Sequence, residues 1–127
     1  MSRFHRGAHY TVDGIQFLHR PVQQPGVPVW TAGYPINVKP LRRAAGRVGF
    51  FPVDLDHPDQ LVEIVTTITG LRRHPFAPYY IAVGLLPGTD PAAWTEAGAT
   101  WWLPEFYLDT LSLDQVCGVA RDGPATR

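Results

Sequence analysis

The strongest constraint on the fold is a regular alternation of short apolar segments with helical segments, which repeats four times after residue 28. The apolar segments predict strands over 29–33, 48–53, 79–84 and 100–103. Helices are predicted after them, over 40–45, from 56 to about 71, from 90 to 98, and from 112 to about 121. Strands that alternate with helices pair in parallel through right-handed crossovers. We therefore predict an α/β fold of four βα units.

Local signals set the ends of these helices. Asp56 is the predicted N-cap of the second helix, because its carboxylate accepts hydrogen bonds from free backbone N–H groups. Gly98 closes the third helix. Ser112 and Gln115 have the spacing of a capping box at the start of the fourth.

The first 28 residues have a different pattern, which predicts a β-hairpin followed by a proline-rich tether. Ala8–Val12 and Ile15–Leu18 flank an Asp13-Gly14 pair, which suits a two-residue turn because both central positions need a positive φ. Three prolines in 21–28 exclude a helix and favour an extended chain. The predicted organisation is therefore a hairpin and tether over 1–28 and a βα region over 29–127.

Composition excludes several classes of protein. Hydrophobic residues make up 45% of the 127 residues and charged residues 17%, which argues against intrinsic disorder. The formal net charge is zero, so the chain lacks the basic surface typical of nucleic-acid binding. No apolar run approaches the roughly 20 residues of a membrane helix, and no signal peptide is visible. We expect a cytoplasmic protein without a nucleic-acid or membrane partner.

Few side chains have the pattern of a catalytic or metal site. The five histidines are scattered and there is one cysteine, so the sequence predicts no metal centre. Asp54, Glu105 and Asp109 follow predicted strands, but no titratable partner stands beside any of them in the sequence, and we interpret them as loop carboxylates. Cys117 lies between apolar neighbours in the last helix and is predicted to be buried. No catalytic residue is assigned.

Two architectures fit four βα units. They can form a small open sheet or one half of an eight-fold barrel. In both, ligands bind at the carboxyl ends of the strands. Here those ends are Gly33-Tyr34, Pro52-Val53-Asp54, Gly84-Leu85 and Pro104-Glu105-Phe106.

Five stretches in the same order resemble the carboxyl-terminal half of the luciferase-like flavin-dependent oxidoreductases. They are Gly7–Tyr10 through Pro21–Pro25, Pro28–Gly33, Leu41–Ala45, Glu96–Trp102 and Arg121–Pro124. Members of this family are barrels of about twice this length, and they bind FMN or the deazaflavin coenzyme F-420. The resemblance implies a partial TIM barrel, in which the four βα units correspond to strands five to eight. It also implies oxidoreductase chemistry of the monooxygenase or dehydrogenase type.

The resemblance carries over three cofactor-binding residues, Thr31, Ala32 and Gly33, at the end of the first βα strand. A glycine there lets the backbone approach a bulky ligand, although it also suits an ordinary strand-end turn. Lys39, Arg42 and Arg43 are candidates for a phosphate tail, but helical arginines are more often solvated.

The sequence departs from the family in ways that bear on activity. The first half of the barrel, which carries most of the active site, has no counterpart. The usual Asp-Gly pair of strand six is Val48-Gly49, and Pro104 displaces the acidic residue after Trp-Trp-Leu to Glu105. His19 replaces a common proline. The expected protein is a truncated oxidoreductase that is inactive or weak alone. A non-catalytic half-barrel interaction module and a fragment from a late start codon are the alternatives.

A half-barrel leaves its inner face and two sheet edges uncovered. We predict that some of the aromatic and aliphatic strand residues face solvent there, from among Trp30, Phe50, Phe51, Tyr80, Ile81 and Trp101. Because neighbouring strand residues face opposite ways, one of Trp101 and Trp102 points inward and the other packs under the helices. An apolar surface of this kind predicts a homo-oligomer or a partner chain that completes the barrel.

Overall fold

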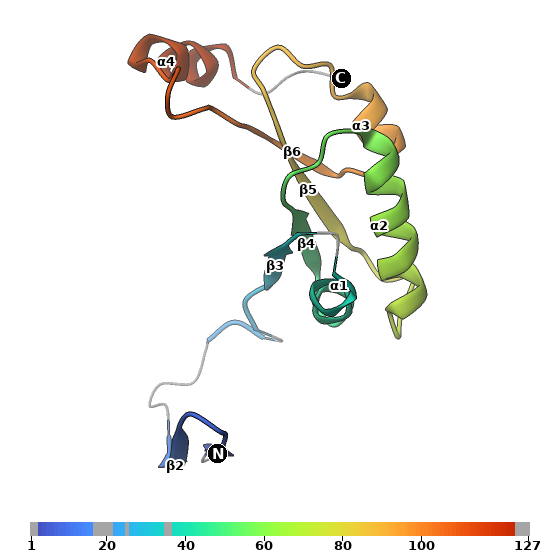
Figure 1. Ribbon diagram of the computed structural model, residues 1–127, viewed down its shortest axis with the longest axis vertical. Helices are drawn as coiled ribbons and strands as arrows, with labels where there is room; N and C mark the ends of the chain where they lie inside the picture. Colours follow the sequence, from blue (N-terminus) through green and yellow to red (C-terminus); the bar gives the residue numbers. More distant parts are fainter. Residues whose placement is uncertain (1–2, 17–21, 25, 35–36, 124–127) are drawn as a thin grey trace.

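The computed structural model describes residues 3–16, 22–24, 26–34 and 37–123. It contains a two-stranded antiparallel sheet and a four-stranded parallel sheet (Figure 1). The parallel sheet is built from β3 (Trp30–Gly33), β4 (Gly49–Pro52), β5 (Tyr80–Leu85) and β6 (Trp101–Pro104). The helices are α1 (Val38–Ala45), α2 (Pro58–Leu71), α3 (Ala92–Glu96) and α4 (Leu113–Asp122). The α/β class and the four predicted βα units are confirmed.

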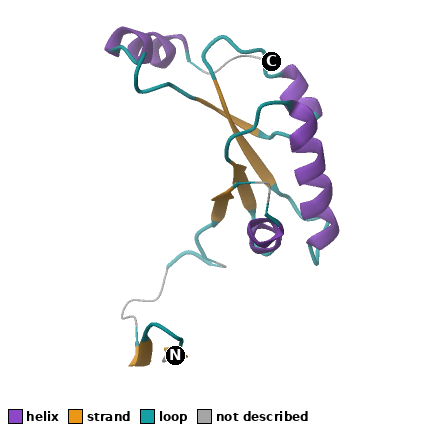
Figure 2. Cartoon of the chain, viewed as in Figure 1, coloured by secondary structure: helices purple, strands orange, loops and turns teal. Residues whose placement is uncertain are grey.

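The strands of the parallel sheet lie in the order in which they occur in the chain, β3-β4-β5-β6. An order without reversal places successive crossover helices on the same face when every crossover has the same hand. Figures 1 and 2 show α1, α2 and α3 together on one side of this sheet. The opposite face carries no helix in the described chain.

The hydrophobic core lies between the sheet and α1, α2 and α3. Phe50 of β4 and Val83 of β5 are fully buried there, beneath Leu61 and Ile68 of α2. Tyr79 joins the first helix to the sheet, because its hydroxyl donates to the Ala44 carbonyl at 2.9 Å. These contacts fix the sheet and three helices as one packed unit.

The N-terminal hairpin is present, but its turn is not at Asp13-Gly14. β1 (Arg3–Arg6) pairs with β2 (Thr11–Ile15), and the connection is closed by Gly7 N–H donating to the Tyr10 carbonyl at 3.0 Å. Asp13-Gly14 lies inside β2, where the register shifts and Gly14 has a φ of 64°. A glycine in the left-handed region satisfies a β-bulge as well as a turn, which is why the Asp-Gly signal was misleading. The predicted arm 15–18 and tether 21–28 fall partly outside the described residues.

Two further local predictions are wrong. The N-cap of α2 is His57 rather than Asp56, and the Gln60 side-chain oxygen accepts from the backbone N–H groups of both. Cys117 is exposed. The helix that carries Cys117, α4, lies away from α1, α2 and α3 (Figure 1), and none of its residues is buried. The capping box of Ser112 and Gln115 at the start of α4 is confirmed.

Among the described residues no helix combines the length and the apolar character needed to cross a bilayer.

Candidate functional site

The side of the parallel sheet without helices, which we call the open face, is defined by the strand register. Trp30 pairs with Gly49, and Gly49 pairs with Tyr80. Paired residues of parallel strands project to the same face, and so do residues two positions apart. The pairing of Ala82 with Trp101 therefore places Trp101 on the face that carries Tyr80.

An aromatic cluster occupies the open face. The rings of Trp30 and Tyr80 are stacked with centroids 5.5 Å apart, and Trp101 meets Trp30 edge to face at 6.0 Å. Trp30 is 37% exposed, Tyr80 40% and Trp101 51%. The predicted partly exposed inner-face residues are thus Trp30, Tyr80 and Trp101. Of the remaining candidates, Phe51 is partly buried on the open face, where it pairs with Ala32, and Phe50 and Ile81 are buried on the helix side.

Gly49 makes this cluster possible. A Cβ at this position would lie 2.8 Å from Cγ and Cδ1 of Trp30, well inside van der Waals contact. The Trp30 indole therefore lies across β4, where it reaches Tyr80 on the next strand. Sequence reasoning treated Gly49 only as the remnant of an Asp-Gly pair. The signal that identifies its role is its register opposite Trp30.

Trp101 and Trp102 divide between the two faces, as the alternation of strand residues predicts. Trp101 is half exposed on the open face, whereas Trp102 is partly buried and packs against the core. The two adjacent indoles therefore have different surroundings, and only Trp101 is available to a ligand or partner on the open face.

The three residues predicted to bind a cofactor lie in β3, but their side chains do not all face the same side of the sheet. Thr31 pairs with Phe50 and so faces the helices, and its Oγ1 is buried without a hydrogen-bond partner. Ala32 is exposed on the open face. Gly33 ends the strand, where a Cβ would lie 2.9 Å from the Cβ of Pro40 in α1. Close packing with α1 therefore accounts for the glycine.

Two carboxylates lie at the carboxyl ends of the strands. Asp54 follows β4 with a φ of 56°, in the left-handed region that few residues other than glycine adopt. The Glu105 carboxylate lies over Gly84 of β5, since a Cβ on that glycine would be 2.6 Å from its Oε2. Asp54 follows β4 and Glu105 follows β6, and β5 lies between these two strands. The axes of β4 and β6 are therefore two strand spacings apart, or about 10 Å. Asp109 is an exposed residue beyond β6, as predicted for a loop carboxylate.

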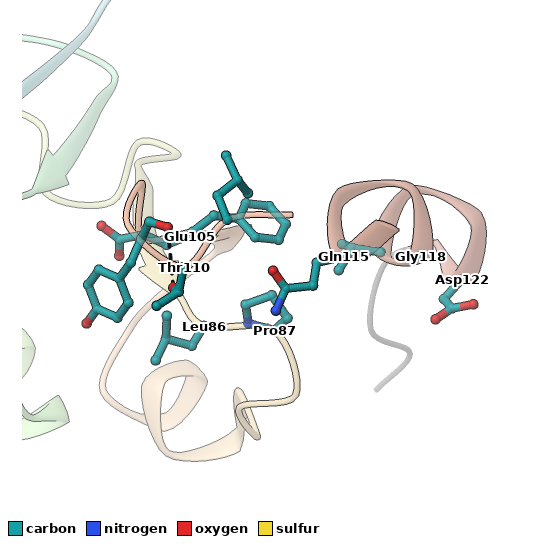
Figure 3. Close-up of a pocket in the computed structure, with 11 residues that line it drawn as sticks. Leu86, Pro87, Glu105, Thr110, Gln115, Gly118 and Asp122 are labelled. Carbon is teal, nitrogen blue, oxygen red and sulfur yellow. Dashed lines mark hydrogen bonds between the residues drawn. The ribbon is translucent and has the colours of Figure 1, made fainter. Parts of the chain in front are cut away.

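A cavity of about 330 Å³ lies between the ends of β5 and β6 and helix α4. Figure 3 shows Leu86, Pro87 and Glu105 on one side, and Gln115 and Asp122 of α4 on the other. Within the described residues, no group of three or more histidine, cysteine, aspartate or glutamate side chains is placed to hold a metal ion.

The basic candidates for a phosphate tail lie on α1. Lys39, Arg42 and Arg43 are exposed. Arg42 and Arg43 belong to the last turn of the helix, and Arg42 also lines a cavity of about 660 Å³ with Val48 and Pro78. Those residues precede β4 and β5, so this cavity is at the amino ends of the strands. The structure does not bring Arg42 to the strand ends where Gly33 lies.

Tyr79 has a strongly perturbed side chain, but it is structural. Burial raises the pKa of its phenol to about 12, and the Arg72 guanidinium over its ring acts in the opposite direction. The same Arg72 donates to the carbonyls of Pro75 and Ala77. Arg72 and Tyr79 together hold the connection between α2 and β5 at the amino ends of the strands.

The chain matches no protein-family model, no curated protein and no solved structure with which it was compared.

Proposed function

We propose that this chain is a half-barrel of the luciferase-like oxidoreductase type, and that it supplies one half of a binding site for FMN or coenzyme F-420. The observation that carries the proposal is the unreversed strand order, with α1, α2 and α3 on one face of the sheet. This is the arrangement of consecutive units in a (βα)8 barrel. The colinear resemblance assigns the units to strands five to eight of such a barrel.

The residues of β3 fit the proposed cofactor in part. Ala32 is exposed on the open face and has a small side chain, so a planar ring system has room beside it. Thr31 faces the helices, and the space at Gly33 is filled by Pro40, so these two residues would act through their backbone groups. A flavin or deazaflavin supplies hydride transfer; the chain's own part is to position the ring.

The proposed half-site is inactive or weak alone. Asp54 and Glu105 follow strands that are not neighbours, because β5 lies between them, so the strand order does not place two carboxylates side by side. The same observation favours a second candidate function, a non-catalytic interaction module that uses the open face. Turnover of reduced cofactor by the purified chain would exclude this second candidate.

A cofactor titration tests the proposal. Trp30 and Trp101 lie on the open face, whereas Trp94 is buried in α3 and Trp102 packs against the core. We expect FMN or F-420 to quench the tryptophan fluorescence with saturation at micromolar concentration, after correction for absorption. The variant carrying Trp30→Phe and Trp101→Phe should lose most of this quenching, although two tryptophans remain.

A matched pair of variants locates the site. Ala32→Leu fills the open face and should weaken binding at least tenfold. Ala93→Leu places the same side chain on the exposed surface of α3 and should leave binding unchanged. Absence of saturation up to millimolar cofactor, or equal effects of the two variants, would overturn the proposed cofactor site.

A further inference from the structure

We infer that a second copy of this chain covers the open face, and that two copies close into an eight-stranded parallel barrel around a two-fold axis along the strands. The inference deepens the proposed function, because it names the source of the missing half of the site. It rests on the half-barrel arrangement and not on the identity of the cofactor.

The two edges of the parallel sheet fit each other. β3 pairs only with β4, and β6 pairs only with β5, among the strands of the described chain. Rotation about an axis along the strands preserves strand direction, so β6 of one copy can pair in parallel with β3 of the other at both seams. Closure removes both edges, and eight strands enclose an interior that side chains can fill.

The strands of the open face offer apolar side chains, and the Glu105 carboxylate, which lies over Gly84, follows β6 at the carboxyl end. Trp30, Tyr80 and Trp101 lie on the open face, together with Leu103, which pairs with Gly84 and is 46% exposed. No residue of β3, β4, β5 or β6 carries a formal charge, and the whole chain has a net charge of zero. Two copies therefore meet without electrostatic repulsion between strand residues.

The helix α4 has no buried residue in the single chain, and closure at a seam would give it a surface to pack on. A barrel helix covers the junction between its own strand and the next, and α1 contacts both β3 and β4 in this way. α4 follows β6, after which the described chain has no further strand. Its apolar Leu113 and Val116 are exposed, as is Leu108 before it. A neighbouring β3 from the second copy supplies the missing surface.

The area required favours the same arrangement. The side chains of Trp30, Tyr80, Trp101 and Leu103 leave roughly 300 Å² exposed per copy, given 150–250 Å² for each aromatic side chain. A stable interface buries about 800 Å² per partner. Contact through the open face alone falls short of that area, so a stable dimer also has to use the strand edges and α4.

The test measures the mass of the purified chain by sedimentation or light scattering between about 1 and 100 µM. The expected particle has twice the chain mass of 14.1 kDa. Hydrogen exchange by mass spectrometry is measured over the same range. In the barrel, the backbone N–H groups of β3 and β6 gain protection as the dimer forms, because both edges become paired. A protein that stays monomeric and folded throughout, or a dimer without added protection at β3 and β6, would overturn the inference.

Two charge substitutions at equally exposed sites locate the interface. Leu103→Asp lies on the open face, and Val62→Asp lies on α2, where Val62 is 47% exposed. We expect Leu103→Asp to weaken dimerisation at least tenfold and Val62→Asp to leave it unchanged. Trp101→Ser replaces Leu103→Asp if the latter loses its helical circular dichroism. Equal effects of the two Asp variants refute the assignment of the open face.

These readouts need no cofactor. A dimer that protects both edges but binds neither FMN nor F-420 would refute the proposed function and leave the barrel standing. A folded monomer that binds a cofactor with saturation would do the reverse.

Discussion

The substitution Gly49→Ala tests the physical basis of the open face, because it adds one carbon atom between two strands. The new Cβ would lie 2.8 Å from Cγ and Cδ1 of Trp30, where ordinary contacts between carbon atoms begin at about 3.5 Å. The indole has to move outward. It then loses its stacking on Tyr80 and its edge contact with Trp101.

Opposing contributions set the size of the effect. Each aromatic pair is worth about 0.5–1.5 kcal/mol, so the two contacts together contribute about 2 kcal/mol. Replacing a strand glycine by alanine raises the free energy of unfolding by about 0.5–1 kcal/mol, because alanine loses less conformational entropy than glycine when the chain folds. Gly49→Ala should therefore lower the free energy of unfolding by about 1 kcal/mol. In the Trp30→Ala background the clash is absent, and the same substitution should be stabilising.

The assay is urea unfolding of the four proteins of this double-mutant cycle, followed by circular dichroism at one fixed concentration. Gly70→Ala is the control, since a Cβ on this helical glycine has no neighbour within 4 Å. Its substitution should stabilise α2 by up to about 1 kcal/mol. If Gly49→Ala destabilises the Trp30→Ala protein as much as the wild type, Trp30 is not the reason for the glycine.

Two further predictions concern side chains on the covered side of the sheet. Because the folded state holds the Tyr79 proton to a pKa of about 12, the contribution of Tyr79 to the free energy of unfolding should be constant below about pH 10 and fall between about pH 10 and 12. Tyr79→Phe should remove this pH dependence of the free energy of unfolding, measured by urea titrations at each pH. It should also lower the free energy of unfolding by about 1 kcal/mol at pH 7, because the hydrogen bond to the Ala44 carbonyl is lost. A pH dependence that survives the substitution would assign the titration to another group. Thr31→Val removes a buried hydroxyl that has no partner at nearly constant shape. It should raise the urea midpoint by an amount equivalent to about 1 kcal/mol, and a lowered midpoint would show that Oγ1 is hydrogen-bonded after all.

The strands and helices of the βα region were predictable because their signals are local. Each strand is a mostly apolar run, interrupted in β3 by Thr31, and proline or glycine marks most boundaries, as Pro58 does at the start of α2 and Gly98 does after α3. The division of Trp101 and Trp102 between the two faces follows from strand geometry alone. The turn of the N-terminal hairpin was not predictable, since a bulge and a turn both require the positive φ of Gly14.

Predictions that depend on tertiary contacts were less successful. Cys117 has apolar neighbours in the sequence, and that pattern predicts burial only if something covers the helix. In the single chain, α4 is uncovered and Cys117 is exposed. The same limit applies to β3. The sequence placed Thr31, Ala32 and Gly33 together at one candidate site, whereas the register turns Thr31 toward the helices and α1 fills the space at Gly33.

Gly49 links the sequence of β4 to the need for a surface that covers the open face. Glycine within a strand lowers the stability of the fold by about 0.5–1 kcal/mol relative to alanine. Here that cost is offset only if the Trp30 indole lies across β4. An indole held there by one stacked ring and one edge contact still leaves more than a third of its surface exposed. The arrangement gains its full stabilisation when another surface excludes water from the cluster, and in an eight-stranded barrel that surface is the same cluster from the second copy.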